Sequence, residues 1–332
     1  MQAPSDQRAR AAYWGSDPIG LPLLDFLADW AADRIELVGV FTQPDRARGR
    51  GRKVVPGPVK AWAEARGIPV LQPEKPGPVE AAWMEERQID LGLVLAYGHI
   101  LRPSHLGAPR LGMINLHGSL LPKYRGASPI ESAIAAGDSE TGMSLMQMVP
   151  AMDAGPVADR ERVPIGDRTT GGELREAMAA AAVRLVRRNL SPLLQGELAF
   201  EEQSETGVSY VRRLNRADGV LDFQAPATVL DRRIRALHPW PGTTVTVGDL
   251  TLKVGSAEAM AETLPGPPGR LQVEPDGGSL RAACGRGSLC FTALQRPGGN
   301  MLPIRDFLRG CPGLDGQVAE SQPMPQLVSD RP

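Results

Sequence analysis

Residues 1–195 alternate between short apolar runs and segments with helical spacing, and this alternation restricts the fold more than any other feature of the chain. Strand-like runs occupy 11–16, 35–42, 68–73, 90–98, 113–118 and 143–149, and helix-like segments occupy 22–32, 57–67, 78–88, 128–137 and 170–190. Continuous apolar runs such as DLGLVLAYG are typical of parallel strands that helices cover on both faces. We therefore predict an α/β fold, with an open, mostly parallel Rossmann-like sheet and helices on both of its faces.

The sequence changes character after residue 195. Residues 196–207 are more polar and contain turn formers, which predicts a linker after a first domain of residues 1–195. Beyond the linker, short strand-like segments are separated by glycines, and a hairpin is predicted around Gly248-Asp249. This spacing predicts a smaller C-terminal β-barrel (OB-like) domain over residues 208–318, followed by a loosely ordered tail, residues 319–332.

Composition argues against several classes of protein. The formal net charge of the 332 residues is −1, so attraction to nucleic acid or to a membrane surface would need a local basic patch. The three cysteines lack CxxC spacing, which argues against a disulfide framework or a zinc site and favours small buried side chains. No apolar stretch resembles a signal peptide or a membrane span. We therefore expect a cytoplasmic protein that does not bind a membrane or a metal.

Two polar side chains lie at the end of the strand-like run MINLH, residues 113–117. Side chains alternate across a strand, so Asn115 and His117 point to the same face near the carboxyl end, where open α/β sheets bind ligands. An amide can donate to a developing oxyanion and an imidazole can donate or accept a proton, which suits acyl transfer to an amine. Asp153 follows the next predicted strand, and a parallel neighbour would bring it to the same edge. In the simpler interpretation, these residues only bond to nearby backbone or form a turn.

The surrounding sequence resembles the folate-dependent formyltransferases. Those enzymes carry an Asn-x-His strand, an SLLP loop that ends in RG, and a later D-x-G, found here at 115–117, 119–122, 125–126 and 153–155. The segments GVFTQPDRARGRGRKVVPGPVK, LAYGHIL, AGDSETGMSLMQM and RIRALHPWPGT resemble in particular the members that act on methionyl-tRNA. The resemblance covers about residues 13–310. Val149 and Pro156 depart from it, because the family usually has acidic residues there.

The resemblance implies a reaction and its residues. The formyl group of the co-substrate 10-formyltetrahydrofolate passes to the α-amino group of methionyl initiator tRNA, giving N-formylmethionyl-tRNA for translation initiation. The implied catalytic residues of the first domain are Asn115, His117 and Asp153. The implied tetrahydrofolate-binding loop consists of Ser119, Leu120, Leu121 and Pro122. The C-terminal domain is implied to bind tRNA, and we expect the enzyme to be a monomer.

The segment DRARGRGRK concentrates positive charge in a glycine-rich loop. The resemblance identifies it as the inserted loop that meets the tRNA acceptor stem, with its key arginine at Arg50 and further cations at Arg46, Arg48, Arg52 and Lys53. A solvated flexible loop is the alternative interpretation of such a charge run. A second cluster could contact tRNA phosphates or simply be solvated surface, and it comprises Arg212, Arg213, Arg216, Arg232, Arg233 and Arg235.

Three other functions are compatible with parts of the sequence. A formyltransferase that acts on a small amine, such as a nucleotide sugar, would share the catalytic residues and folate but would not explain the basic inserted loop. A non-catalytic tRNA-binding relative would explain the loop but not the intact Asn115, His117 and Asp153. A metal hydrolase is disfavoured, because no second histidine lies at ligand spacing from His117.

Overall fold

The computed structural model describes residues 8–48 and 53–331, and the chain divides into two compact units. The first unit comprises Met1–Ala127, Glu140–Pro164 and Arg175–Tyr210, and the second comprises Ser128–Ser139, Ile165–Leu174 and Val211–Pro332. The sequence predicts a single boundary between domains, whereas two short segments of the predicted first domain belong to the second unit. One reason is that helix α5 (Pro129–Ala136) packs against helix α7 (Ala227–Ala236).

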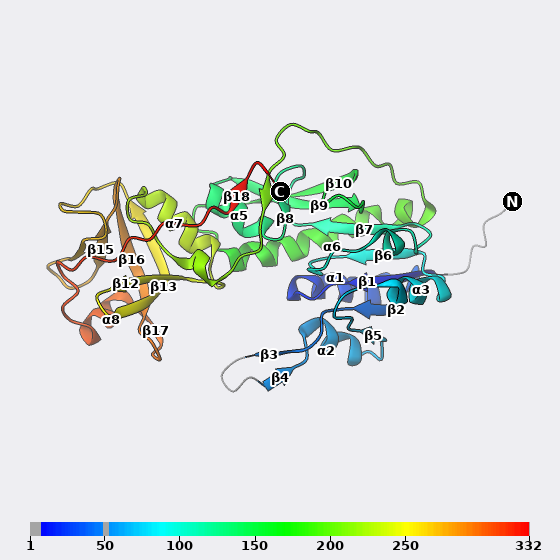
Figure 1. The fold of residues 1–332 in the computed structure, drawn as a ribbon, viewed down its shortest axis with the longest axis horizontal. Helices are drawn as coiled ribbons and strands as arrows, with labels where there is room; N and C mark the ends of the chain where they lie inside the picture. Colours follow the sequence, from blue (N-terminus) through cyan, green and yellow to red (C-terminus); the bar gives the residue numbers. More distant parts are fainter. Residues whose placement is uncertain (1–7, 49–52, 332) are drawn as a thin grey trace. The chain divides into compact units, whose positions relative to one another are not determined.

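A seven-stranded sheet forms the centre of the first unit (Figure 1). Its strand order is β10-β9-β7-β6-β1-β2-β5, with bounds Val157–Pro164, Glu140–Gln147, Met113–His117, Leu91–Val94, Ala9–Trp14, Ile35–Phe41 and Val70–Leu71. The strands from β7 to β5 are parallel, and β9 and β10 are antiparallel additions at one edge. The predicted mostly parallel sheet is confirmed.

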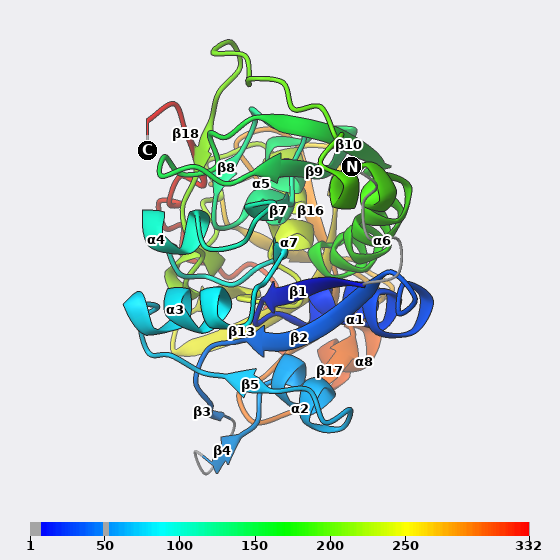
Figure 2. The same ribbon diagram turned by 90° about the vertical axis from the view of Figure 1, so that its right-hand side faces the viewer.

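Helices cover both faces of this sheet, as Figure 2 shows, with α1 and α6 on one side and α3 and α4 on the other. Helix α1 continues as a π-helical segment, Phe26–Trp30. The helix bounds are Leu21–Asp25 for α1, Pro58–Glu64 for α2, Pro78–Glu86 for α3, Pro103–Leu106 for α4 and Gly171–Gln195 for α6. No helix in the described parts of the chain is both long and apolar enough to cross a membrane.

Strand β1 lies inside the sheet although its second residue is Arg10. It pairs with β2 on one side and with β6 on the other. Tyr13 and Trp14 are fully buried, and the Trp14 indole stacks on the Phe41 ring with centroids 3.7 Å apart. These large aromatic side chains bury the apolar area that a short strand with three alanines would otherwise lack.

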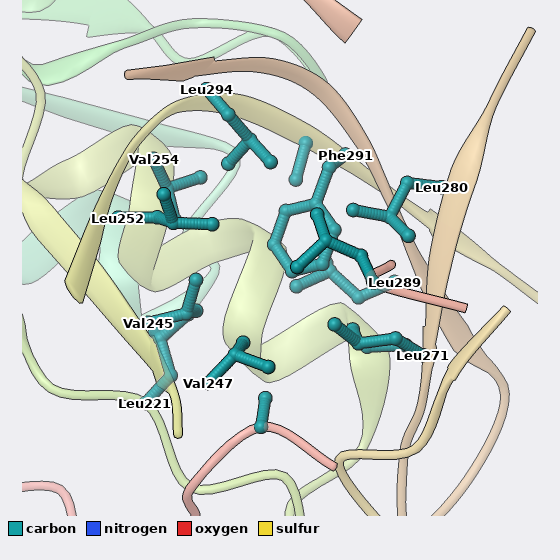
Figure 3. Packing of buried hydrophobic residues seen from close by; sticks show 14 of the residues in the cluster. Leu221, Val245, Val247, Leu252, Val254, Leu271, Leu280, Leu289, Phe291 and Leu294 are labelled. Atoms are coloured by element: carbon teal, nitrogen blue, oxygen red, sulfur yellow. The ribbon is translucent and has the colours of Figure 1, made fainter. Parts of the chain in front are cut away.

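The second unit contains a six-stranded antiparallel sheet with the order β12-β13-β16-β15-β14 and with β17 paired to β16. The strand bounds are Thr243–Val247, Leu250–Met260, Ser288–Gln295, Leu280–Ala283, Leu271–Val273 and Met301–Pro303. β12 and β13 form the hairpin predicted around Gly248-Asp249. The sheet curls into a half-barrel, and Figure 3 shows its inner side chains, among them Leu252 and Phe291, converging on one core. Helix α7 supplies Leu230 and Ile234 to this core, and α8 (Ile304–Gly310) supplies Phe307.

The C-terminal segment of the second unit packs against the rest of that unit. Ala319 and Leu327 are buried, and a short strand, β18 (Val328–Ser329), follows them. The backbone N–H of Glu320 donates to the carbonyl of Thr246 at 2.8 Å. The expectation of a loosely ordered tail is therefore wrong for the described residues, because the tail has apolar side chains that the second unit can bury.

Candidate active site

Strand β7 carries the first two residues of the candidate site. It lies between β6 and β9, and its Asn115 and His117 project to the same face. His117 is 5% exposed, and Asn115 is half-buried. Burial restricts the conformations of both side chains. They lie near the carboxyl end of a parallel strand, and open α/β sheets bind their ligands at these ends.

Asp153 reaches these residues by an unexpected route. β9 runs antiparallel to β7, so the end of β9 lies beside the start of β7, where Gln147 pairs with Ile114. The connection between β9 and β10 then turns back over the face that carries Asn115 and His117. Asp153 adopts a φ of 49° in this connection, a left-handed conformation that L-residues other than Asn and Asp rarely adopt. The prediction of a parallel neighbouring strand is wrong, but the three predicted side chains do meet.

The Asp153 carboxylate is held by the backbone and faces two side chains. The Gly126 N–H donates to Asp153 Oδ2 at 2.8 Å. The same oxygen lies 3.6 Å from His117 Nδ1, and Oδ1 lies 3.5 Å from Asn115 Nδ2. Both side-chain distances are longer than ordinary hydrogen bonds. The amide and the imidazole can therefore exchange these weak contacts for hydrogen bonds to a substrate without breaking the Asp153–Gly126 contact.

The tautomer of His117 follows from its partners. His117 Nε2 lies 2.9 Å from the carbonyl oxygen of Tyr124. A carbonyl oxygen only accepts, so Nε2 must carry a hydrogen and donate it. In the neutral ring, Nδ1 is then the nitrogen with a lone pair, and it faces the Asp153 carboxylate. A proton taken up at Nδ1 would lie beside a negative charge, which is the arrangement that a general base needs.

Ser144, on β9, fixes the conformation of the loop from Ser119 to Pro122 through two hydrogen bonds. Its hydroxyl donates to the Ser119 carbonyl at 2.6 Å and accepts from the Leu121 N–H at 3.1 Å. Ser119 is fully buried and Leu121 is 2% exposed, so these two side chains hold the loop in place. Leu120 and Pro122 are half-buried, and they are the side chains of the loop that a ligand could contact. The run MSLMQ predicts a buried strand, but no sequence signal marks Ser144 as a loop anchor.

The basic loop begins after β2. Its described parts include two short antiparallel strands, β3 (Arg46–Arg48) and β4 (Lys53–Val55). Arg50 and Arg52 lie outside the described residues. Arg46 is exposed to solvent, as a residue that meets a polyanion must be.

The base of this loop is fixed by Asp45. Its carboxylate accepts from Lys60 Nζ at 2.6 Å, from the Gly57 N–H at 3.3 Å and from Gln72 Nε2 at 3.0 Å. The hydrogen bond from Lys60 is the main cause that lowers the pKa of Asp45, and its counterpart raises the pKa of Lys60. Both groups therefore stay charged near neutral pH, and they join the two ends of the loop at one point.

The second basic cluster is largely engaged in holding the second unit together. Arg233 is 7% exposed and donates to the carbonyl of Asp218, while Arg212 forms an ion pair with the Asp218 carboxylate. Arg235 pairs with Asp231 at 3.0 Å. A role in tRNA contact is therefore wrong for the buried Arg233. The arginines of this cluster that are exposed to solvent are Arg212, Arg213 and Arg216.

Comparison with known families decides where the chain belongs. A family model described as formyl transferase matches residues 23–190, and one described as formyl transferase, C-terminal domain, matches residues 213–312. The methionyl-tRNA formyltransferase of Xanthomonas euvesicatoria pv. vesicatoria is 42% identical over 280 residues, which are 84% of this chain and 91% of that protein. The chain belongs to the methionyl-tRNA formyltransferase family. The family member of Parvibaculum lavamentivorans is 41% identical over 304 residues, 91% of this chain and 96% of that protein.

Solved structures of more distantly related proteins share the fold of the present chain. An N-formyltransferase from Helicobacter canadensis, solved with folinic acid and dTDP-3-aminofucose, matches with a TM-score of 0.63 at 17% identity over 87% of this chain and 100% of that chain. HypX from Aquifex aeolicus, solved with tetrahydrofolic acid, matches with a TM-score of 0.59 at 16% identity over 92% of this chain and 47% of that chain. At this identity the likeness establishes the fold alone.

Proposed function

We propose that this enzyme transfers the formyl group of 10-formyltetrahydrofolate to the α-amino group of methionyl initiator tRNA. The observation that carries the proposal is the cluster around Asp153, in which a carboxylate faces an amide and an imidazole whose Nδ1 can accept a proton. The cluster offers an oxyanion donor and a proton acceptor without a nucleophilic side chain, which suits direct attack by a substrate amine. Identity of 42% to an enzyme named for methionyl-tRNA supports the acceptor.

Each of the three side chains has its own role in this reaction. When bound, 10-formyltetrahydrofolate supplies a formamide-like carbonyl. Asn115 donates an amide N–H to the formyl oxygen as negative charge develops there. His117 accepts a proton from the attacking amine at Nδ1, while its Nε2–H stays bonded to the Tyr124 carbonyl. Asp153 stabilises the resulting imidazolium, and His117 can return the proton to the departing nitrogen of the folate.

The loop from Ser119 to Pro122 fits the folate in this proposal. Its Leu120 and Pro122 offer apolar contacts of the kind that a flat aromatic ring requires. Ser119 and Leu121 stay buried and keep the loop in shape through Ser144. The chemistry of these side chains therefore matches a neutral, planar ligand and not a phosphate.

An assay of purified protein with 10-formyltetrahydrofolate and charged tRNA tests the function directly. We expect formylation of methionyl initiator tRNA, slower reaction with methionyl elongator tRNA, and none with a dTDP-amino sugar. Formylation of the sugar nucleotide in preference to the tRNA would support a small-amine enzyme instead. Binding of initiator tRNA without any turnover would support a non-catalytic relative.

The basic loop predicts a specific effect of salt. Replacing Arg50 by alanine should weaken the interaction with tRNA and lower the slope of log(kcat/KM) against log[salt] by about one unit, if the residue contacts one phosphate. The KM for 10-formyltetrahydrofolate should not change. Steady-state kinetics at several salt concentrations measure both quantities.

Arg110→Ala is the matched control for this variant. Its side chain is 63% exposed and pairs with Asp90, and it lies just before the start of β7, at the sheet edge opposite the carboxyl ends of the strands. It should leave the salt slope unchanged. An unchanged slope for Arg50→Ala as well would mean that the basic loop is only solvated surface.

A further inference from the structure

Gln203 lies next to the candidate active site but outside both ranges that the family models match, residues 23–190 and 213–312. We infer that Gln203 is a positioning residue, which holds the backbone at Asp153 in its left-handed conformation and so keeps the carboxylate facing His117. The inference rests on the catalytic role proposed for Asp153. It concerns a residue in a segment that the sequence predicts to be only a linker.

The side-chain amide of Gln203 bridges two carbonyls of the Asp153 loop. Its Nε2 donates to the carbonyl oxygen of Asp153 at 2.8 Å and to that of Gly155 at 2.8 Å. A primary amide has two N–H hydrogens, so both donors of Gln203 are used on this loop. These bonds fix the direction of the carbonyl that follows the φ of 49° at Asp153. Aspartate tolerates this conformation better than most residues with a Cβ, but it is still less favourable than the right-handed one, so surrounding contacts help to maintain it.

Arg125 determines which way the Gln203 amide points. Arg125 Nε and Nη2 donate to Gln203 Oε1 at 3.2 Å and 2.8 Å. A guanidinium has only donors and a carbonyl only accepts, so a flipped amide would place donor against donor and acceptor against acceptor. The orientation of Gln203 therefore follows from the chemistry of its neighbours.

The neighbouring residues Arg125 and Gly126 together hold both the backbone and the side chain of Asp153. Arg125 orients Gln203, which holds the backbone carbonyl of Asp153. The next residue, Gly126, donates its N–H to the Asp153 side chain at 2.8 Å. The contacts form a closed ring from Arg125 through Gln203 and Asp153 to Gly126. Removing the Gln203 donors opens this ring while leaving every catalytic side chain in place.

Gln203 can act in this way because its own segment is fixed nearby. Glu201 and Val157 form an antiparallel bridge, with their backbone hydrogen bonds at 2.8 Å and 3.0 Å. Val157 is the first residue of β10, directly after the Asp153 loop. The irregular segment that carries Gln203 is thus attached to the sheet two residues before the amide.

The test compares Gln203→Glu and Gln203→Ala with wild-type enzyme in the formylation assay. The glutamate has the same shape and keeps the contact with Arg125, but it places oxygen atoms against the carbonyls of Asp153 and Gly155. Gln203→Glu loses the two hydrogen bonds to these carbonyls, and Gln203→Ala also loses the two from Arg125. In both variants we expect kcat to fall about tenfold while KM for folate and for tRNA stays the same. A purely structural role would move KM and the melting temperature together with kcat. Wild-type kcat in both variants would overturn the inference.

Gln147→Glu is the matched control for the change in charge. Gln147 is exposed and pairs with Ile114, so it faces away from the side of β7 that carries Asn115. It should keep the wild-type kcat. A tenfold loss of kcat in this control would show that added negative charge alone lowers kcat, and it would overturn the inference.

Hydrogen exchange provides a readout that does not need activity. The Gly126 amide is protected by the Asp153 carboxylate, so a peptide containing Gly126 should exchange faster in Gln203→Glu and in Gln203→Ala but not in Gln147→Glu. If wild-type protein does not formylate methionyl-tRNA, the proposed function fails, and this measurement still decides whether Gln203 holds the loop. Unchanged exchange at Gly126 in both Gln203 variants would reject the inference whatever the activity.

Discussion

Replacing His117 by alanine is expected to lower kcat for formyl transfer by a factor on the order of 10²–10⁴, the usual contribution of a positioned acid–base group. The variant loses Nδ1, which accepts the proton of the attacking amine in the proposed reaction. KM should change little, because His117 is 5% exposed and provides almost no binding surface. Steady-state kinetics with methionyl initiator tRNA, together with the melting temperature of each protein, check this result.

Asp153→Asn tests the second half of the same mechanism. Asparagine keeps the size of the side chain but removes the negative charge that lies 3.6 Å from His117 Nδ1. A loss of kcat of similar size is expected with an intact melting transition. Asp33→Asn, at a carboxylate that is 78% exposed, is the control for the loss of one charge and should be fully active. Turnover near the wild-type level in a folded His117→Ala or Asp153→Asn protein would show that the roles assigned to them are wrong.

The part of the site that lies on one strand follows from local sequence. Asn115 and His117 are two residues apart in an apolar run, so the period of a strand places them on one face without knowledge of any partner. Asp153 is different, because its position depends on the direction in which β9 pairs with β7. No local pattern in residues 140–147 encodes that direction, and the left-handed turn at Asp153 contains no glycine at the residue itself that would indicate it. Family resemblance identifies Asp153, whereas its route to the site comes from tertiary structure.

Residues that support the site carry even weaker sequence signals. Gln203 lies in a polar stretch that predicts a linker, and its role depends on contacts with residues 50 and 78 positions away. Ser144 lies 25 positions from the carbonyl that it holds. Such contacts are long-range, so single-sequence periodicity cannot reveal them.

The burial of Arg233, in contrast, can be predicted from the sequence. In helix α7 it lies at i+3 from Leu230 and next to Ile234, both buried, so helical periodicity places it on the apolar face. Counting charges along the chain groups it with exposed arginines, while helical spacing predicts burial. A buried guanidinium requires fixed acceptors, and the Asp218 and Pro325 carbonyls supply them.

Asp218, the carboxylate beside Arg233, gives the largest effect on stability that we expect. Replacing Asp218 by alanine should lower the free energy of unfolding by about 1–3 kcal/mol, the usual cost of leaving buried hydrogen-bonding groups without their partner. The Asp218 side chain is 0% exposed, and its carboxylate accepts from Arg212 and from the Asn215 N–H at 2.7 Å. Its loss leaves that N–H without its acceptor and leaves the buried Arg233 without a nearby negative charge. Urea unfolding followed by circular dichroism measures the change.

The pH dependence of this difference separates a lost charge from lost packing. Burial by itself raises the pKa of Asp218, but the hydrogen bonds from Arg212 and from the Asn215 N–H outweigh it and hold the pKa below its ordinary value. A carboxyl group whose pKa is lowered by folding contributes its stability above the unfolded pKa, about 3.9, and loses that contribution as the pH falls through the folded value. The difference between wild type and Asp218→Ala should therefore be full at neutral pH and shrink below about pH 4. Asp306→Ala, in an exposed pair with Arg309, is the control and should cost only about 0–1 kcal/mol at any pH. A difference that stays constant down to low pH would mean that Asp218 stabilises the second unit by filling space and not by its charge.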